Sequence, residues 1–304
     1  MYLQTLISSL VQMCLMIGLG YYLKRTNILS SEHISGLSNL LLSVILPFSI
    51  LASGNQYFSN GLAQSLAFTV VIVGAYYSLT LLISWLLFKW VIKEKGKVGV
   101  SITMTVFANT GFMGFPLAMI LYGSKGLLYA AVYNLLYNLF LFSFGVKLLG
   151  ADTRSISWKE IVSDPLTISS ILAIILFISP IKLPQVIQAT LEAVGDMTGP
   201  VSMVIVGAWM VGVNWKRILL SKFAYVVCFI RLLVYPLITL LILKCFNLRP
   251  EMIGTIVLLT ALPIGSLNVI FAQKYGADVV YVNETMLLSL FFSMITIPVV
   301  MMLV

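Results

Sequence analysis

The stretch Asn109-Thr110-Gly111-Phe112-Met113-Gly114-Phe115-Pro116 interrupts an apolar segment that spans residues 98–121. Pro116 has no N–H to donate and its ring crowds the carbonyl of Phe112, while Gly111 and Gly114 lower the cost of unwinding a helix. Backbone groups that are freed in lipid need a partner, so irregular backbone here implies burial in protein or in a watery cavity. The stretch therefore predicts a membrane helix that is broken near its middle.

A second stretch of the same kind, Ala261-Leu262-Pro263-Ile264-Gly265-Ser266-Leu267-Asn268, lies within the apolar segment 252–273. Pro263 and Gly265 weaken the helix there, as the proline and glycines of the first stretch do. Either stretch alone is equally well explained by an isolated proline kink in a packed helix. Two matched breaks with flanking polar side chains instead favour a binding site, as in transporters built around discontinuous helices.

The residues beside the two breaks indicate the kind of ligand. The start of a half-helix presents N–H groups and a positive dipole end, which favour an anion; the end of a half-helix presents carbonyls, which favour a cation or a proton carrier. The predicted substrate-binding set combines break residues with neutral donors and acceptors. The break residues are Gly111, Pro116 and Pro263, and the donors and acceptors are Asn109, Thr110, Ser266 and Asn268. This set suits a carboxylate that must bind and then leave.

Composition places these stretches in a membrane. Of the 304 residues, 60% are hydrophobic and 9% are charged, whereas soluble domains carry about 25% charged residues. One crossing takes about 20 apolar residues. The chain thus predicts an all-α polytopic membrane protein with ten transmembrane helices, near residues 3–23, 34–53, 62–91, 98–121, 126–149, 165–181, 185–213, 218–245, 252–273 and 279–304.

Two halves are indicated by an internal repeat. The polar stretch 151–164 separates a first five-helix half, residues 1–150, from a second, residues 165–304. Matching residues recur at an offset of 153, with Pro47, Ser49 and Gly54 matching Pro200, Ser202 and Gly207, and Tyr122-Gly123 matching Tyr275-Gly276. Because each half has an odd number of crossings, the second half enters the membrane in the opposite orientation, which is an inverted repeat. The two prolines and two serines predict further helix breaks in segments 2 and 7.

Charge predicts the orientation. The loops that follow segments 1, 3, 5, 7 and 9 hold thirteen Lys and Arg residues against four on the other side. Cations are disfavoured on the translocated side, so the first set is expected in the cytoplasm and both termini outside the inner (plasma) membrane. The formal net charge of +8 is attributed to these loops and not to nucleic-acid binding.

The chain resembles the auxin efflux carrier family in the motif of residues 109–116, in the Pro47 and Pro263 helices and in the five-plus-five layout. That family includes plant auxin exporters and bacterial carriers of malate or malonate. The resemblance implies a scaffold of helices 1, 2, 6 and 7, and a moving transport domain of helices 3–5 and 8–10 whose broken helices 4 and 9 cross at the site. It carries Asn109, Pro116 and Pro263 over as site positions, and it implies a homodimer through the scaffold. The short loop between the halves favours a prokaryotic member.

Other polar residues inside the apolar segments have two interpretations each. Arg231 either attracts the anion or regulates a coupling site, or it is a snorkelling or structurally paired cation. Glu284 and Asp196 either carry a coupling proton or lie at an interface. Asn134 and Asn138 share a helical face and either line the cavity or, as the safer reading, bond a neighbouring helix.

These observations predict a secondary transporter that moves a small organic anion by alternating access and has only the substrate and membrane lipid as further partners. No ATP site, metal-ligand spacing or cofactor motif is visible, His33 is the only histidine, and an enzyme is not expected. The alternatives are a membrane receptor or sensor that retains the transporter fold, a sodium-coupled organic anion symporter, and an intramembrane enzyme. Proton coupling or uniport is ranked above sodium coupling, because no carboxylate adjoins either break.

Overall fold

The structure is a computed structural model that describes residues 2–55, 59–92, 94–149, 162–212 and 221–304. These residues are helical or irregular, and their only strand-like pairing is one isolated bridge. The helices of the first half are α1 (Tyr2–Arg25), α2 (Ser31–Leu40), α3 (Leu46–Gly54), α4 (Asn60–Val91), α5 (Lys95–Val106), α6 (Phe115–Phe140) and α7 (Val146–Leu148). Those of the second half are α9 (Pro165–Ile178), α10 (Gln185–Gly195), α11 (Thr198–Trp209), α13 (Lys222–Phe229), α14 (Tyr235–Lys244), α15 (Pro250–Ala261), α16 (Leu267–Lys274) and α17 (Val279–Met302).

Several of these elements join into apolar helices that are long enough to cross a membrane. Within the described ranges, five such helices are Ser31–Gly54, Asn60–Val91, Thr110–Leu148, Lys222–Lys244 and Val279–Met302, and shorter apolar helices are Pro165–Ile178 and Pro250–Ala261. Their length and composition fit a polytopic membrane protein.

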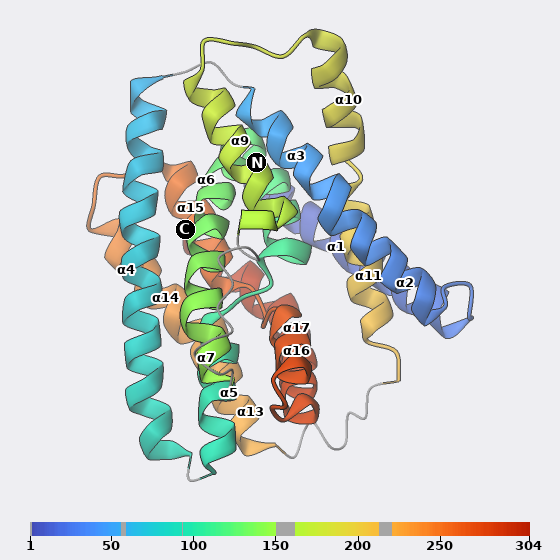
Figure 1. The fold of residues 1–304 in the computed structure, drawn as a ribbon, viewed down its shortest axis with the longest axis vertical. Helices are drawn as coiled ribbons and strands as arrows, with labels where there is room; N and C mark the ends of the chain where they lie inside the picture. The colour runs from blue at the N-terminus through green and yellow to red at the C-terminus, as the bar shows by residue number, and fades with distance from the viewer. Residues whose placement is uncertain (1, 56–58, 93, 150–161, 213–220) are drawn as a thin grey trace.

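The helices pack in two groups (Figure 1), with α4 and α10 at opposite sides of the molecule. Group I consists of α1, α2, α3, α9, α10 and α11, in which α1 packs on α11 and α3 packs on α9 and α10. Group II consists of α4 to α7 and α13 to α17, in which α6 packs on α4 and α15, and α13 packs on α17. Helix α6 also contacts α3, α9 and α11, so it connects the two groups.

Small residues allow two helix pairs of group I to approach very closely. A Cβ atom added at Gly54 would overlap the backbone of Ala173, which joins α3 to α9, and one added at Gly207 would overlap the backbone of Ile17, which joins α11 to α1. Glycine is the residue that permits such backbone contact between membrane helices. Gly54 and Gly207 are separated by the repeat offset of 153, so equivalent glycines join corresponding helix pairs.

Prolines in three helices follow π-helical turns: η1 (Leu41–Ile45), η2 (Thr110–Gly114) and η5 (Ile230–Val234), before Pro47, Pro116 and Pro236 respectively. In each case the residue just before the proline donates its N–H to the carbonyl five residues earlier. Because proline has no N–H, the carbonyl four residues before it loses its usual helical hydrogen bond. A π-turn redistributes the hydrogen bonds around that carbonyl. Helix 31–54 therefore continues through Pro47 and Ser49 instead of breaking there. A fourth π-helical turn, η3 (Leu141–Gly145), follows α6 without a proline.

Segment 7 does have an interruption. Helix α10 ends at Gly195 and α11 begins at Thr198, so the interruption precedes Pro200, which lies in the first turn of α11. Ser202 donates its hydroxyl to the carbonyl of Gly199 within that turn.

The two central helices are broken where they cross. Residues 107–109 separate α5 from η2, and residues 262–266 separate α15 from α16. The two irregular strands pair: the Asn109 N–H donates to the Pro263 carbonyl at 2.9 Å, and the Gly265 N–H donates to the Phe107 carbonyl at 3.1 Å. The first break thus ends two residues before Gly111 and seven residues before Pro116, because the π-turn η2 accommodates the proline.

Glycines with positive φ mark two further joints. Gly123 has φ 60° and ψ −152° inside α6, so α6 is two helices that meet there, as the sequence predicted for segments 4 and 5. Gly276 has φ 72° between α16 and α17. These backbone angles are readily adopted by glycine, and both joints lie at the same position of the repeat.

Candidate functional site

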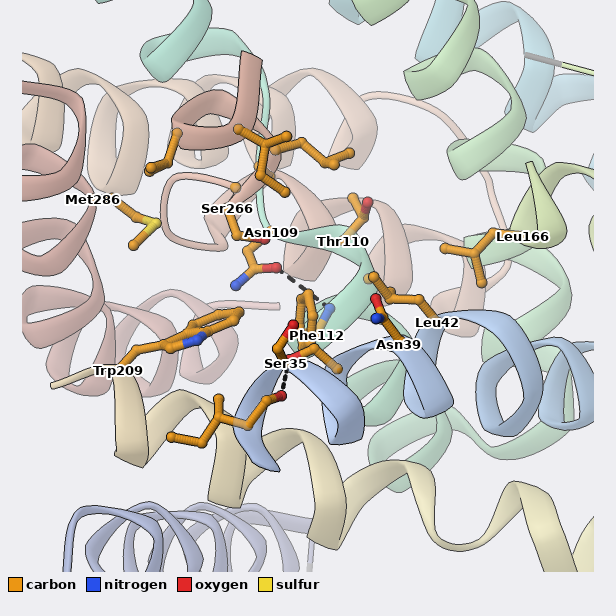
Figure 2. A pocket seen from close by; sticks show the side chains of 18 of the residues that line it. Ser35, Asn39, Leu42, Asn109, Thr110, Phe112, Leu166, Trp209, Ser266 and Met286 are labelled. Atoms are coloured by element: carbon orange, nitrogen blue, oxygen red, sulfur yellow. Dashed lines mark hydrogen bonds between the residues drawn. The ribbon is translucent and has the colours of Figure 1, made fainter. Parts of the chain in front are cut away.

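A cavity of about 750 Å³ lies where the crossing of the broken helices meets group I. Figure 2 shows side chains that converge on it from both groups, with Asn109, Thr110 and Ser266 on one side and Ser35, Asn39 and Trp209 on the other. Lys24 and Ser31 also line it and flank the loop between α1 and α2. The cavity therefore reaches the side of the membrane on which that loop lies.

Asn109 is buried between the two breaks and is fixed by its own hydrogen bonds. Its Oδ1 accepts from the Phe112 N–H at 3.3 Å, which caps the start of η2 (Figure 2). Its backbone is held to Pro263 on the other broken helix. Asn109 thus ties the start of one half-helix to the crossing and still lines the cavity.

Asn134 presents an unpaired donor. The Thr110 hydroxyl donates to Asn134 Oδ1 at 3.2 Å, which orients the side-chain amide. Asn134 is 2% exposed and lines the cavity, and its Nδ2 has no hydrogen-bond partner. A buried donor without a partner costs about 1–3 kcal/mol, so this N–H₂ group is suited to an acceptor brought by a ligand.

The walls of the cavity are mostly apolar. The Phe112 and Trp209 rings meet edge to face with their centroids 4.8 Å apart, and they join η2 to α11 across the two groups. Leu42, Leu166 and Met286 are further apolar residues of these walls (Figure 2). Such walls would cover the apolar body of a small molecule, while the amides and hydroxyls orient its polar end.

Two half-helix starts face the cavity. Thr110 and Gly111 open η2, and Ser266 and Leu267 open α16, and all four residues line the cavity. The positive ends of the helix dipoles therefore lie beside it and favour a negative charge. Among the described lining residues, the charged side chains are Lys24 and Asp164. The described part of the chain contains no cluster of three or more His, Cys, Asp or Glu residues that could hold a metal ion.

Arg231 lies outside the cavity lining and is fully buried. Its guanidinium binds the ends of both broken helices, since α5 ends at Val106 and α15 ends at Ala261. Its hydrogen-bond acceptors are the carbonyls of Thr105, Val106, Leu259 and Leu262 and the hydroxyl of Tyr76. A permanent cation thus lies at two negative dipole ends. Among the described residues it is held by neutral oxygens, which differs from both the predicted snorkelling position and the predicted ion pair.

Other residues of the predicted set lie behind the cavity. Pro116 and Pro263 shape the helices but do not line it. Asn268 is fully buried and donates its Nδ2 to the carbonyls of Phe107 and Gly265, both at 3.0 Å. It therefore braces the crossing from behind.

The acidic candidates and the group I positions also lie away from the cavity. Glu284 is half-buried and does not line it, although its neighbour Asn283 does. Asp196 is exposed at the end of α10, where it lines a separate small pocket of about 130 Å³ with Ser49. Pro47, Pro200 and Ser202 do not line the central cavity.

Sequence reasoning did not single out several lining residues, among them Ser35, Asn39, Trp209 and Asp164. Ser35 and Asn39 are four residues apart and so share a helical face. Asn134 and Asn138 have the same spacing, and that spacing is the sequence signal by which Ser35 and Asn39 could have been found. Asn134 and Asn138 both line the cavity. Asp164 looked like a loop residue because it directly precedes an apolar segment.

Comparison with known proteins extends the picture to the whole chain. A family model described as membrane transport protein matches residues 5–156 and 151–301. An uncharacterized transporter of Methanocaldococcus jannaschii is 25% identical over 298 residues, covering 93% of this chain and 94% of its own length. The uncharacterized transporter YfdV of Escherichia coli is 24% identical over 286 residues, covering 89% of this chain and 88% of its own length. An uncharacterized transporter of Methanothermobacter thermautotrophicus is 25% identical over 300 residues, covering 97% and 96% of the two chains.

Proposed function

Because the chain belongs to the membrane transport protein family, that of the auxin efflux carriers, we propose that it is a secondary transporter of a small organic anion. The family is one of membrane transporters and not of enzymes. The substrate class proposed is a carboxylate with an apolar body, and the site is the cavity at the crossing of the two broken helices.

The observation that carries the proposal is the convergence of donors on one cavity. Two half-helix starts and the unpaired Nδ2 of Asn134 present uncharged N–H groups to the cavity. These donors match the acceptor-only chemistry of a carboxylate. Hydrogen bonds from neutral donors suit a substrate that must also be released.

The proposed mechanism is alternating access by an inverted repeat of ten crossings, with halves at residues 1–150 and 165–304 joined by residues 151–164. Equivalent glycines at Gly54 and Gly207 and positive-φ joints at Gly123 and Gly276 support the repeat. Group I would be the scaffold and group II the transport domain. Both termini would lie outside the inner membrane, so the described state would open to the cytoplasm near Lys24. Two copies would pair through the scaffold.

Sodium coupling at the crossing is the less favoured variant of this mechanism. The carbonyls at the ends of α5 and α15 are the groups that could bind a cation there, and they already accept hydrogen bonds from Arg231. A uniport or a proton-linked mechanism therefore fits the site better.

The test is charge movement across proteoliposomes that contain the purified protein, with a panel of mono- and dicarboxylates. We expect currents for some acids, a loss of at least about tenfold in Asn109→Ala, and no requirement for sodium; a tenfold loss corresponds to about 1.4 kcal/mol. Asn247→Ala is the matched control, because Asn247 is exposed in the loop between α14 and α15. Wild-type protein that produces neither current nor counterflow of any labelled carboxylate would refute the anion assignment and favour a sensor that retains the transporter fold.

A further inference from the structure

Asp164 is a half-buried carboxylate in the wall of the central cavity. It caps the start of α9, because its Oδ2 accepts from the Thr167 N–H at 2.8 Å and from the Thr167 hydroxyl at 2.9 Å. Its Oδ2 also accepts from Asn138 Nδ2 at 3.0 Å. Since Asn138 is on α6 and Asp164 is the N-cap of α9, this contact crosses from group II to group I.

A helix cap alone does not account for this placement. A cap requires an oxygen acceptor, which an uncharged Asn or Ser would also supply, whereas Asp164 adds a negative charge to a cavity that otherwise favours anions. Burial raises the pKa of the Asp164 carboxyl above its ordinary value, and the bonds from Thr167 and Asn138 offset part of that rise. Burial therefore disfavours the charged form of this side chain.

Few other charges face Asp164 among the described residues. Helix α6 contributes the Tyr137 hydroxyl, and α1 contributes Lys24 in the cavity lining. The turn η1 and helix α3, which also pack on α9, carry no charged or titratable side chain. Among the described residues no other carboxylate lines the cavity, so a bound organic anion would bring a second negative charge to it.

We propose that Asp164 takes up one proton when an organic anion enters the cavity. The inference rests on the proposed function. A proton from cytoplasmic water binds the Asp164 carboxylate as the anion arrives, so a monoanion and the proton together leave the net charge of the cavity unchanged. Two like charges in a partly desolvated site disfavour each other, and protonation removes that repulsion.

The proton is not transported with the substrate. Asp164 belongs to group I, the proposed scaffold, while the anion would move with group II. When the transport domain moves away, the anion leaves, Asp164 loses the Asn138 contact, and the proton returns to the cytoplasm. Proton uptake therefore adjusts the affinity of the cytoplasm-facing site, which binds its anion more tightly as the cytoplasm becomes more acidic.

The experiment measures binding of indole-3-acetate and malonate to the purified full-length protein by titration calorimetry from about pH 5.5 to about pH 8. Buffers with different ionisation enthalpies report how many protons are taken up per anion bound, and the ionisation of malonate itself is subtracted. In wild-type protein we expect net proton uptake on binding. We also expect the Kd to increase as pH rises, with a limiting slope of about tenfold in Kd per pH unit.

The decisive variant is Asp164→Asn, because Asn caps a helix as well as Asp does and cannot ionise. It should fold and bind the anion with no proton uptake and with a Kd that does not change with pH. Asp164→Glu should retain proton uptake, as should Asn138→Ala, which removes a neighbour but leaves the carboxylate.

Three results would overturn the inference. Wild-type binding without proton uptake would refute it while leaving the anion transporter in place. Equal proton uptake in Asp164→Asn would assign the proton to another group. A preference for tryptophan over indole-3-acetate that disappears in Asp164→Asn would show that the carboxylate binds an ammonium group instead. Failure of every carboxylate to bind wild-type protein would refute the proposed function itself.

Discussion

At the residue scale, the structure separates two kinds of polar group that look alike in the sequence. Asn109 and Asn134 line the cavity, whereas Arg231 and Asn268 brace the crossing from behind. The sequence placed Asn109 and Asn268 beside the breaks, and it left two interpretations each for Asn134 and Arg231. Which of them faces the cavity depends on helix rotation and on the π-turns, and one sequence does not determine either.

Arg231 gives a direct test of this distinction. Arg231→Met removes five hydrogen bonds and leaves four carbonyls and the Tyr76 hydroxyl without that donor. Buried acceptors without partners are costly, so we expect a loss of about 3 kcal/mol or more, measured as a lower Tm in detergent. Arg231→Lys should recover part of it, because an ammonium keeps the charge but lacks the planar fork of donors.

The control for that measurement is Arg25→Met. Arg25 is exposed and donates to the Tyr21 hydroxyl at 3.1 Å. Its removal should change stability by no more than about 0.5 kcal/mol. Equal Tm values for Arg231→Met and Arg25→Met would contradict the bracing role of Arg231.

At the element scale, the sequence predicted that the central helices break, but it placed the first break too late. The sequence shows that Pro116 lacks an N–H donor. It does not show that a π-turn redistributes the neighbouring backbone hydrogen bonds. The same local solution keeps helix 31–54 continuous at Pro47. The joint at Gly123 was easier to predict, because a tyrosine-glycine pair recurs at the corresponding position of the second half.

Helix α1 supplies a matched pair of glycines for the packing of group I. A Cβ atom at Gly20 would overlap the backbone of Val204 on α11, whereas one at Gly18 meets nothing within 4 Å. Gly20→Ala should therefore separate α1 from α11 and lower the Tm by an amount equivalent to about 1–3 kcal/mol. Gly18→Ala should raise stability by about 0.5–1 kcal/mol, because alanine favours a helix interior. If both variants shift the Tm in the same direction, the close contact is not important.

At the scale of the whole molecule, membrane residence and family follow from composition and from the two broken stretches. The division into two packed groups does not follow from composition or from those stretches. It depends on contacts between helices that are far apart in the chain, such as α1 and α11. The predicted scaffold helices 1, 2, 6 and 7 are those of group I, and the movement of group II against them stays a prediction.

A cross-link between the groups tests that movement. A Cβ atom at Gly111 in η2 would lie 3.4 Å from Leu42 Cδ2 in η1, across the boundary between the groups. In a protein without Cys14, Cys228 and Cys245, joining Leu42→Cys to Gly111→Cys with a short, reducible thiol reagent should abolish substrate-dependent current. Reduction should restore it. Currents that persist in fully cross-linked protein would show that the groups need not move apart.

Arg231 has a consequence for the electrical behaviour of the carrier. All of its hydrogen-bond partners belong to group II, so its permanent positive charge would travel with that group through the membrane field. A charge that crosses the full field gains or loses about 2.3 kcal/mol per 100 mV. A bound monoanion of the proposed kind would offset this charge, and the loaded step would then be nearly insensitive to voltage. The membrane potential would therefore act on the return of the empty carrier and would set the turnover rate through that step.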